Sequence, residues 1–341
     1  MQAAHYAVRW PNARVVGIDL SATSIAFEQE LKGRHALDNL ELQQLAVERV
    51  AELGERFDMV VCTGVLHHLG DPDTGLRALR SVLAQSGAMH VMVYAPYGRA
   101  GIYMLQEYCR RLGIGWSDAE IRDLAATLKA LPPDHPIAPL LRGAPDFASP
   151  AGIADALLHP LDRSYSVDQL MELLARADVA FGRWVRQAPY LPECGAPAAT
   201  PHSSRLAGLP QDEQYAAIEL FRGTMVRHSI VCYADGETAR QSAVHFNGDA
   251  WLRYVPIRLP DTVTVRDRLP PGAAAVLINR NHTFTDLYLP IDARQERVLE
   301  AVDGKRRITD MGRAMADMPL ARNFFEQLWR WDQVVFDTSD A

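Results

Sequence analysis

Several features that would define a class of protein are scarce in this sequence. Its four cysteines, Cys62, Cys109, Cys194 and Cys232, are widely separated, which excludes both a dense disulfide framework and a cysteine zinc motif. No apolar run reaches the roughly 20 residues that span a bilayer, and the first residues lack the pattern of a signal peptide. We therefore expect no membrane segment and a cytoplasmic location.

Basic charge is also scarce. The chain has 35 Lys and Arg residues against 42 Asp and Glu residues, for a net charge of -7. Duplex binding needs clustered basic side chains against phosphates, so we do not expect nucleic acid as a partner. With 341 residues, 48% of them hydrophobic, the chain is long enough to bury a sizeable core, and its length predicts two domains.

A glycine-rich loop is missing where one is expected. The first predicted strand, residues 14–20, carries Asp19 near its end. In nucleotide-binding α/β folds such an acid follows a strand, a glycine loop and a helix, about 20 residues after the glycines. Here only the end of a helix, residues 3–10, precedes the strand. We expect a sequence truncated within the fold, the alternatives being a decayed fragment or another element that fills the gap.

After Asp19, strands and helices alternate in the order typical of a parallel sheet. Ser21 can cap a helix that runs to about His35. The continuous apolar stretch at 57–64 predicts a strand covered on both faces, and Ser86-Gly87 predicts a helix stop. The remaining predicted elements are strands at 40–47 and 89–94 and helices at 48–55 and 75–83.

The ordered set of segments resembles the class I S-adenosylmethionine-dependent methyltransferases. The resemblance rests on the strand with Asp19, the segment 57–69, the following helix and strand, and a match that resumes at Tyr165. It implies a Rossmann-like, mostly parallel α/β sheet that lacks its first strand, with S-adenosyl-L-methionine as the cofactor. Residues 179–185 resemble the sixth strand of the family, and residues 228–233 resemble the antiparallel seventh strand, which closes a domain of residues 1–236.

The resemblance also implies cofactor contacts. Asp19 would accept both ribose hydroxyls, because a carboxylate offers two acceptor oxygens, and Leu20 follows it. The acid that the family places near the adenine amino group is absent, so Ala46 and Val47 would make backbone or apolar contacts, with Glu48 as a displaced substitute. The crevice at the carboxyl end of the family's fourth strand would be lined by Thr63, Gly64 and Val65.

Two adjacent histidines follow that crevice. Because histidine titrates near neutral pH, His68 is the candidate general base, and a structural role of the His67-His68 pair in the loop is the alternative. No carboxylate or other third ligand stands at zinc spacing along the chain, so the sequence predicts no metal site. Tyr94 and Tyr97, after the next strand, either face the methyl acceptor or belong to the core or its rim.

Residues 98–160 predict a helical insertion, with helices at 101–112 and 117–131. Ser117 and Glu120 have the spacing of a capping box. We expect the insertion to cover the cofactor crevice as a lid, the alternative being a packing or dimerisation module that would make the protein a homodimer. The stretch 189–210, rich in proline and alanine, predicts an irregular connection outside the core.

Residues 237–341 form a second predicted unit without obvious catalytic residues. Strands at 250–255 and 274–278, helices at 293–302, 308–315 and 320–331, and a strand at 334–336 suggest a winged-helix-like α+β domain. Its second helix offers Arg313 beside Asp310 and Asp317, which lacks the basic character of a DNA-reading helix. A regulatory or protein-contact role is therefore favoured.

The sequence as a whole predicts S-adenosylmethionine-dependent methyl transfer to a small-molecule or protein acceptor. The alternative is a catalytically inactive, truncated methyltransferase-like protein with a binding or regulatory role. Nicotinamide-dependent reduction is the third possibility, and it is less favoured because nothing that resembles a hydride-transfer site follows the strand at 89–94.

Overall fold

The computed structural model describes residues 2–312 and 317–339 of the chain. Two sheets that contain parallel strand pairs dominate its first part. The first sheet has two strands, β1 and β2, paired in parallel, and the second has four strands in the order β3-β4-β6-β5. Strands β3 and β4 are parallel, whereas β6 is antiparallel to both β4 and β5. The strands are β1 (Val15–Asp19), β2 (Leu40–Gln44), β3 (Phe57–Thr63), β4 (Leu83–Tyr94), β5 (Ala180–Trp184) and β6 (Arg227–Tyr233).

Within the described residues, β1 pairs only with β2 and β3 pairs only with β4. Each of these two strands therefore has one edge without a neighbouring strand. The prediction that β3 is covered on both faces was wrong for its first half, because Asp58 and Met59 are exposed, Met59 by 51%. Phe57 packs against the core at the start of the strand, and core packing resumes at Val60.

Helices cover the four-stranded sheet and supply its core. The helices of this part are α1 (Gln2–Arg9), α2 (Ala22–His35), α3 (Pro72–Ser81), α8 (Val167–Arg176), α9 (Ser203–Ala207) and α10 (Gln211–Arg222). Leu76 of α3 and Leu170 of α8 are fully buried together with Met89 and Val91 of β4 and Ile230 of β6. Ser21 caps α2 as predicted, its side chain accepting from the N–H of Ser24.

The predicted helix stop at Ser86-Gly87 was wrong, because both residues lie inside β4. Helix α3 begins earlier than expected, after the Asp71 cap, and ends at Ser81. A Cβ atom at Gly87 would lie 2.9 Å from the carbonyl oxygen of Phe57. The glycine therefore permits close approach of the β3 backbone.

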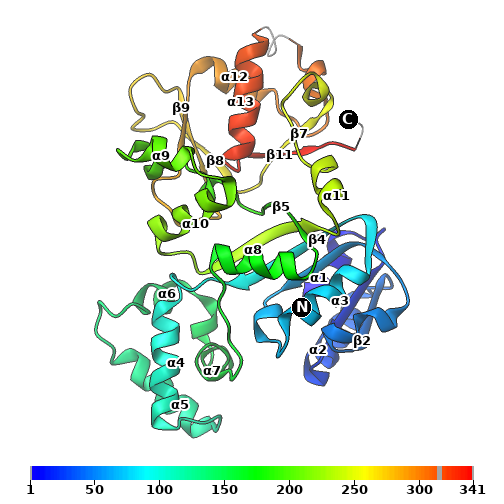
Figure 1. Cartoon of the computed structure of the whole chain (residues 1–341), viewed down its shortest axis with the longest axis vertical. Helices are drawn as coiled ribbons and strands as arrows, with labels where there is room; N and C mark the ends of the chain where they lie inside the picture. The colour runs from blue at the N-terminus through cyan, green and yellow to red at the C-terminus, as the bar shows by residue number, and fades with distance from the viewer. Residues whose placement is uncertain (1, 313–316, 340–341) are drawn as a thin grey trace.

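The insertion forms a separate helical group with a core of its own. Its helices are α4 (Ala100–Leu112), α5 (Asp118–Lys129), α6 (Ala138–Gly143) and α7 (Pro150–Leu158). Ile102, Leu105, Leu124 and Leu157 are buried among them. The predicted capping box of Ser117 and Glu120 at the start of α5 is present. These helices lie together at the end of the molecule that is remote from the C-terminal part (Figure 1).

The stretch 189–210 was wrongly predicted to lie outside the core. Tyr190 and Cys194 are buried, and the Tyr190 ring stacks on Trp184 with centroids 3.8 Å apart. Stacking of two large rings removes much apolar surface from water, which outweighs the irregular backbone of this stretch.

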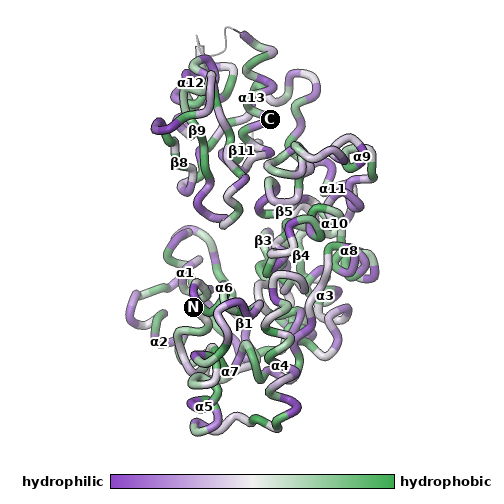
Figure 2. The backbone as a smooth tube through the Cα atoms, turned by 90° about the vertical axis from the view of Figure 1, so that its left-hand side faces the viewer, coloured by the Kyte–Doolittle hydropathy of each residue, from purple (hydrophilic) through white to green (hydrophobic). Residues whose placement is uncertain are grey.

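The C-terminal part contains two small sheets and forms the opposite end of the molecule (Figure 2). Strand β7 (Val255–Arg258) pairs with β11 (Val334–Asp337), and β8 (Thr262–Val265), β9 (Ala275–Asn279) and β10 (Leu289–Ile291) form the antiparallel order β10-β9-β8. Its helices are α11 (Gly236–Gln241), α12 (Ala293–Glu300) and α13 (Met318–Arg330).

Two predictions for this part were wrong. The strand predicted at 250–255 is a 3₁₀ turn, Ala250–Arg253, which buries Trp251 before β7 begins. At the start of the helix predicted at 308–315, Ile308–Asp310 form a short 3₁₀ turn instead. Residues 313–316, and with them Arg313, lie outside the described residues. Across the part of the chain that the structure describes, no helix is both long and apolar enough to cross a membrane.

A buried carboxylate joins the C-terminal part to the segment after β5. Asp332, only 3% exposed, accepts hydrogen bonds from the backbone N–H groups of Gln187 and Ala188 at 3.0 and 2.9 Å. Burial raises the pKa of Asp332 to about 6, although these N–H groups and the nearby Arg183 and Arg186 act in the opposite direction.

We predict that Asp332 makes stability depend on pH. From about pH 4 to about pH 6 the folded protein binds a proton at Asp332 that the unfolded chain does not. The free energy of unfolding is therefore higher at low pH and falls as pH rises through this range. The shift of about two units corresponds to roughly 3 kcal/mol. Denaturant unfolding at several pH values should give a flatter pH profile for Asp332→Asn, and an unchanged profile would contradict this account. Asp38→Asn, an exposed change, is the control.

A second prediction concerns a buried polar chain. The Tyr190 hydroxyl donates to Nδ1 of His228 at 2.7 Å, and Nε2 of His228 donates to Glu219 at 2.9 Å. Tyr190→Phe leaves Nδ1 buried without a donor and should lower the free energy of unfolding by about 1–3 kcal/mol. Tyr288→Phe, at a residue 45% exposed, should change it little in the same denaturant titration. Equal effects of the two changes would refute the assigned role of the chain.

Candidate active site

The carboxyl end of β1 presents Asp19 and Leu20 to solvent. The Asp19 carboxylate accepts the N–H of Ser21 at 2.8 Å, and Leu20 is 72% exposed. The backbone N–H of Leu45 donates to the Asp19 carbonyl at 3.0 Å, and the Gln44 side chain donates to the Leu20 carbonyl at 3.1 Å. These bonds bring the segment after β2 alongside Asp19, so a carboxylate and an apolar side chain share one edge of the sheet.

Ala46 and Val47 follow directly on that edge and are both half-buried. Ala46 has an extended backbone and precedes the 3₁₀ turn Val47–Leu53. The Val47 side chain packs against the core, with Cγ1 3.8 Å from the position of a Cβ atom on Gly75. Its backbone is therefore the part that remains for a ligand, whereas Glu48 is exposed.

The end of β3 carries Thr63, Gly64 and Val65, all of them half-buried. The Thr63 hydroxyl donates to the Gln2 side chain at 3.0 Å. Gly64 has a φ of +78°, a left-handed conformation that favours glycine, and a Cβ atom there would meet only Met92 at 3.8 Å. Backbone conformation is therefore what demands glycine at this position.

Helix α1 links the two sheet ends. Gln2 contacts Thr63 of β3, while Ala3 lies so close to β1 that a Cβ atom on Gly17 would be 2.8 Å from its side chain. The first turn of α1 thus lies against both β1 and β3. Gly17 of β1 and Thr63 at the end of β3 therefore flank the same helix terminus.

The 3₁₀ turn Leu66–His68 follows, and it buries His67 almost completely, at 1% exposure. Its ring lies 3.9 Å from the Tyr94 ring, between centroids. Among the described residues neither ring nitrogen of His67 has a hydrogen-bond partner. Burial lowers the pKa of His67 to about 3, with smaller contributions from the neighbouring His68, Arg99 and His159. The ring is consequently neutral at physiological pH.

His68 has a defined orientation. Its Nδ1 lies 2.6 Å from the Leu161 carbonyl oxygen, so Nδ1 carries the proton and donates it. The lone pair is then on Nε2. The His159 ring lies 4.1 Å from the His68 ring, between centroids. His68 therefore has the tautomer that a proton acceptor or a metal ligand needs.

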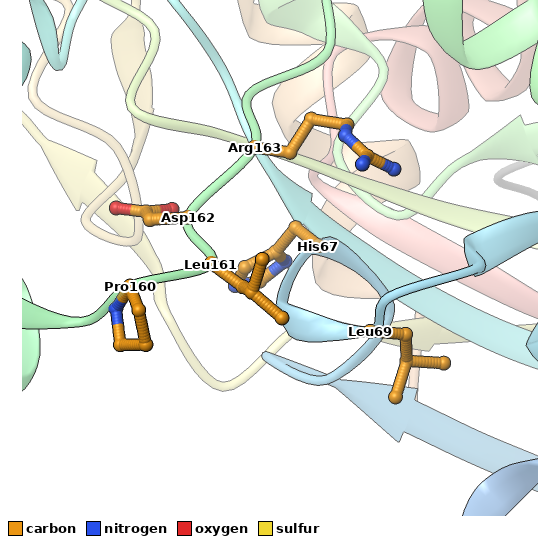
Figure 3. Close-up of a pocket in the computed structure, with 6 residues that line it drawn as sticks. All are labelled: His67, Leu69, Pro160, Leu161, Asp162 and Arg163. Carbon is orange, nitrogen blue, oxygen red and sulfur yellow. The ribbon is translucent and has the colours of Figure 1, made fainter.

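Residues 160–163, which return the chain from the insertion, lie against this histidine turn (Figure 3). The Arg163 N–H donates to the His67 carbonyl at 3.1 Å. The turn and this segment line a cavity of about 250 Å³, with walls formed by His67, Leu69, Pro160, Leu161, Asp162 and Arg163. Pockets for drug-sized ligands start at about 300 Å³, so the cavity is suited to a small group or an ion.

Asp162 is the residue that sequence reasoning missed. Its side chain is 2% exposed, and Oδ2 accepts from Arg99 at 3.2 Å and from Gln106 at 2.8 Å. Ligand-type atoms of His67, His68 and Asp162 lie within 4.8 Å of one another. Spacing along the chain did not reveal this third group because more than 90 residues separate it from the histidines. No signal near Asp162 in the sequence marks it.

The two tyrosines after β4 occupy different places. Tyr94 is half-buried, with the Arg99 guanidinium 3.4 Å from its ring centroid on one side and the His67 ring beside it. Tyr97 is 41% exposed. Tyr94 thus belongs to the packing around the histidine turn, which was one of the two expectations for it.

Comparison with known proteins covers both sequence and fold. Residues 2–89 match the family described as a methyltransferase domain. An uncharacterized protein of Synechococcus sp. is 32% identical over 217 residues, which are 62% of this chain and 52% of that protein. The chain thus spans about half the length of this curated relative.

Similarity of fold extends over nearly the whole chain. The structure of PKMT2 from Rickettsia typhi superposes with a TM-score of 0.64 at 14% identity, covering 98% of this chain and 68% of that one. PKMT2 in complex with AdoHcy gives a TM-score of 0.62 at 14% identity, over 96% and 67% of the two chains. The predicted resemblance and the Rossmann-like fold class are confirmed: residues 2–89 match the methyltransferase-domain family, and the fold is similar to that of PKMT2.

Proposed function

We propose that the chain transfers a methyl group from S-adenosyl-L-methionine to a small-molecule or protein acceptor. The observation that carries the proposal is the methyltransferase-domain match over residues 2–89, which includes the exposed Asp19 at the carboxyl end of β1 and the Thr63-Gly64-Val65 turn at the end of β3. The AdoHcy bound to PKMT2, a protein of similar fold, supports this choice of cofactor.

In this proposal the edge formed by β1 and β2 holds the nucleoside. The two Asp19 oxygens accept the ribose hydroxyls, and the Ser21 N–H that already bonds Oδ1 keeps the carboxylate in place. The exposed Leu20 side chain offers an apolar surface to the adenine ring, and the backbone at Ala46 and Val47 borders its polar edge. This use explains why a leucine stands in water beside a carboxylate.

The turn at the end of β3 borders the methyl donor. Gly64, with no Cβ, lets a ligand approach the backbone between Thr63 and Val65. The cofactor supplies a sulfonium methyl group, which passes to a nucleophile by in-line displacement as the carbon–sulfur bond breaks. The task of the protein is then mainly to place the acceptor. Where the acceptor must lose a proton, Nε2 of His68 accepts it, because Nδ1 is already engaged by Leu161.

We further propose that the chain is divided into a methyltransferase-like domain, residues 1–236, and a C-terminal domain, residues 237–341. Two buried clusters support this division, one around β4 and α8, which Leu287 of the C-terminal part also joins, and another around Phe324, Phe325 and Leu328 of α13. The helical insertion at 98–160 would select the acceptor, since its return segment forms one wall of the cavity beside His67.

The proposal is tested by calorimetric titration of S-adenosylhomocysteine into the full chain. Asp19→Ala removes the charged acceptor for two hydroxyls and should weaken binding by about 10- to 100-fold, which corresponds to roughly 1.5–3 kcal/mol. Asp38→Ala is the matched control, because Asp38 is an exposed aspartate just before β2, at the opposite end of the same two-stranded sheet.

Binding to the unchanged chain and to Asp38→Ala, with loss in Asp19→Ala, is the expected pattern. Equal affinity of all three proteins would remove Asp19 from the cofactor site. Absence of binding to the unchanged chain would contradict the proposed function. A positive result leads to incubation with methyl-labelled S-adenosylmethionine and either the proteins or the small molecules of a cell extract, to identify the class of acceptor.

A further inference from the structure

Three buried polar atoms in and beside the histidine turn have no hydrogen-bond partner in the part of the protein that the structure describes. Within the described residues, both ring nitrogens of His67 and the Oδ1 atom of Asp162 lack a hydrogen bond. His67 is 1% exposed, and the Asp162 side chain is 2% exposed. An unpartnered buried polar group is costly, and several of them in one place call for an explanation by a ligand.

We propose that His67, His68 and Asp162 bind a divalent transition-metal ion of the zinc type. Each of the three residues offers one ligand atom, and these atoms lie within 4.8 Å of one another. The set joins a turn after β3 to the segment after α7. An ion at this point would therefore fasten the helical insertion to the parallel sheet.

The surroundings of two of the ligands match those of metal sites. A ligating histidine usually donates its other ring N–H to a carbonyl or carboxylate, which fixes the tautomer. His68 does this through Nδ1 and the Leu161 carbonyl. A ligating carboxylate is usually held by further hydrogen bonds, and the Oδ2 atom of Asp162 accepts from Arg99 and Gln106 while Oδ1 remains available.

The donor set selects the kind of ion. Mg²⁺ and Ca²⁺ prefer shells composed of oxygen, whereas two imidazoles and one carboxylate suit zinc and related transition metals. Three protein ligands leave a fourth position open. The adjoining cavity of about 250 Å³, which His67 and Asp162 both line, has room for a water molecule or a small ligand at that position.

Two neighbouring side chains, Arg99 and His159, bear on the site. The Arg99 guanidinium lies 3.2 Å from Asp162 and repels a cation, which weakens binding relative to a site without it. His159 lies next to His68, but its Nδ1 accepts the Leu161 N–H at 3.1 Å. A neutral ring that accepts at Nδ1 carries its proton on Nε2, so we do not include His159 among the ligands. The inference does not rest on methyl transfer, and a bound ion would make Nε2 of His68 a ligand in place of a proton acceptor.

The test is a titration of the chelator-treated full chain with CoCl₂, followed by visible ligand-field absorption, and then displacement by ZnCl₂. We expect one ion per chain. His68→Gln and Asp162→Asn should each weaken binding at least tenfold. His159→Asn is the matched control, because it removes an adjacent imidazole outside the ligand set, and it should leave binding unchanged.

A second readout protects the test against misfolded variants. Zinc should raise the midpoint of thermal unfolding of the unchanged chain and of His159→Asn, since a ligand of the folded state stabilises it. If Asp162→Asn fails to fold, as judged by circular dichroism, His68→Gln decides alone. The inference is overturned if the unchanged chain binds no stoichiometric ion, or if His68→Gln binds it as tightly as the unchanged chain does.

Discussion

The hydrogen bonds between residues 161–165 and the ends of β3 and β4 hold the functional end of this molecule together. Leu161 accepts from His68, Arg163 donates to the His67 carbonyl, and Tyr165 donates to the Tyr94 carbonyl at 2.8 Å. They set the tautomer of His68, place Asp162 beside the histidines and form a wall of the cavity.

Buried polar groups connect the remaining parts in a similar way. Asp332 binds the backbone at Gln187 and Ala188, and it joins the C-terminal sheets to the segment that leaves β5. The chain of Tyr190, His228 and Glu219 joins that segment to β6 and α10. Each group is costly to bury unless its partner is in place, so these contacts specify one arrangement of the parts more sharply than apolar packing does.

Predictions from the sequence were correct where the interaction involves residues close together in the chain. Ser21 and Ser117 cap helices as predicted, because a capping side chain bonds to backbone groups within three residues. Predictions were wrong where residues far apart in the sequence determine the local structure. Ser86-Gly87 resembles a helix stop, but it lies within β4, at the irregularity where the pairing with β3 passes from Leu83 to Ala88. The stretch 189–210 resembles a loop, but the Tyr190 ring stacks on Trp184 in the core.

The sequence by itself determined the alternation of strands and helices from β1 to β4, the acid at the end of β1, the glycine after β3 and the family that these resemble, because periodicity, caps and turn residues act over a few positions. Only the tertiary structure decided which side chains meet. Asp162, Arg99 and His67 belong to three segments with no common pattern. Their contact arises because the insertion folds back onto the sheet, and that depends on hydrogen bonds between residues far apart in the chain.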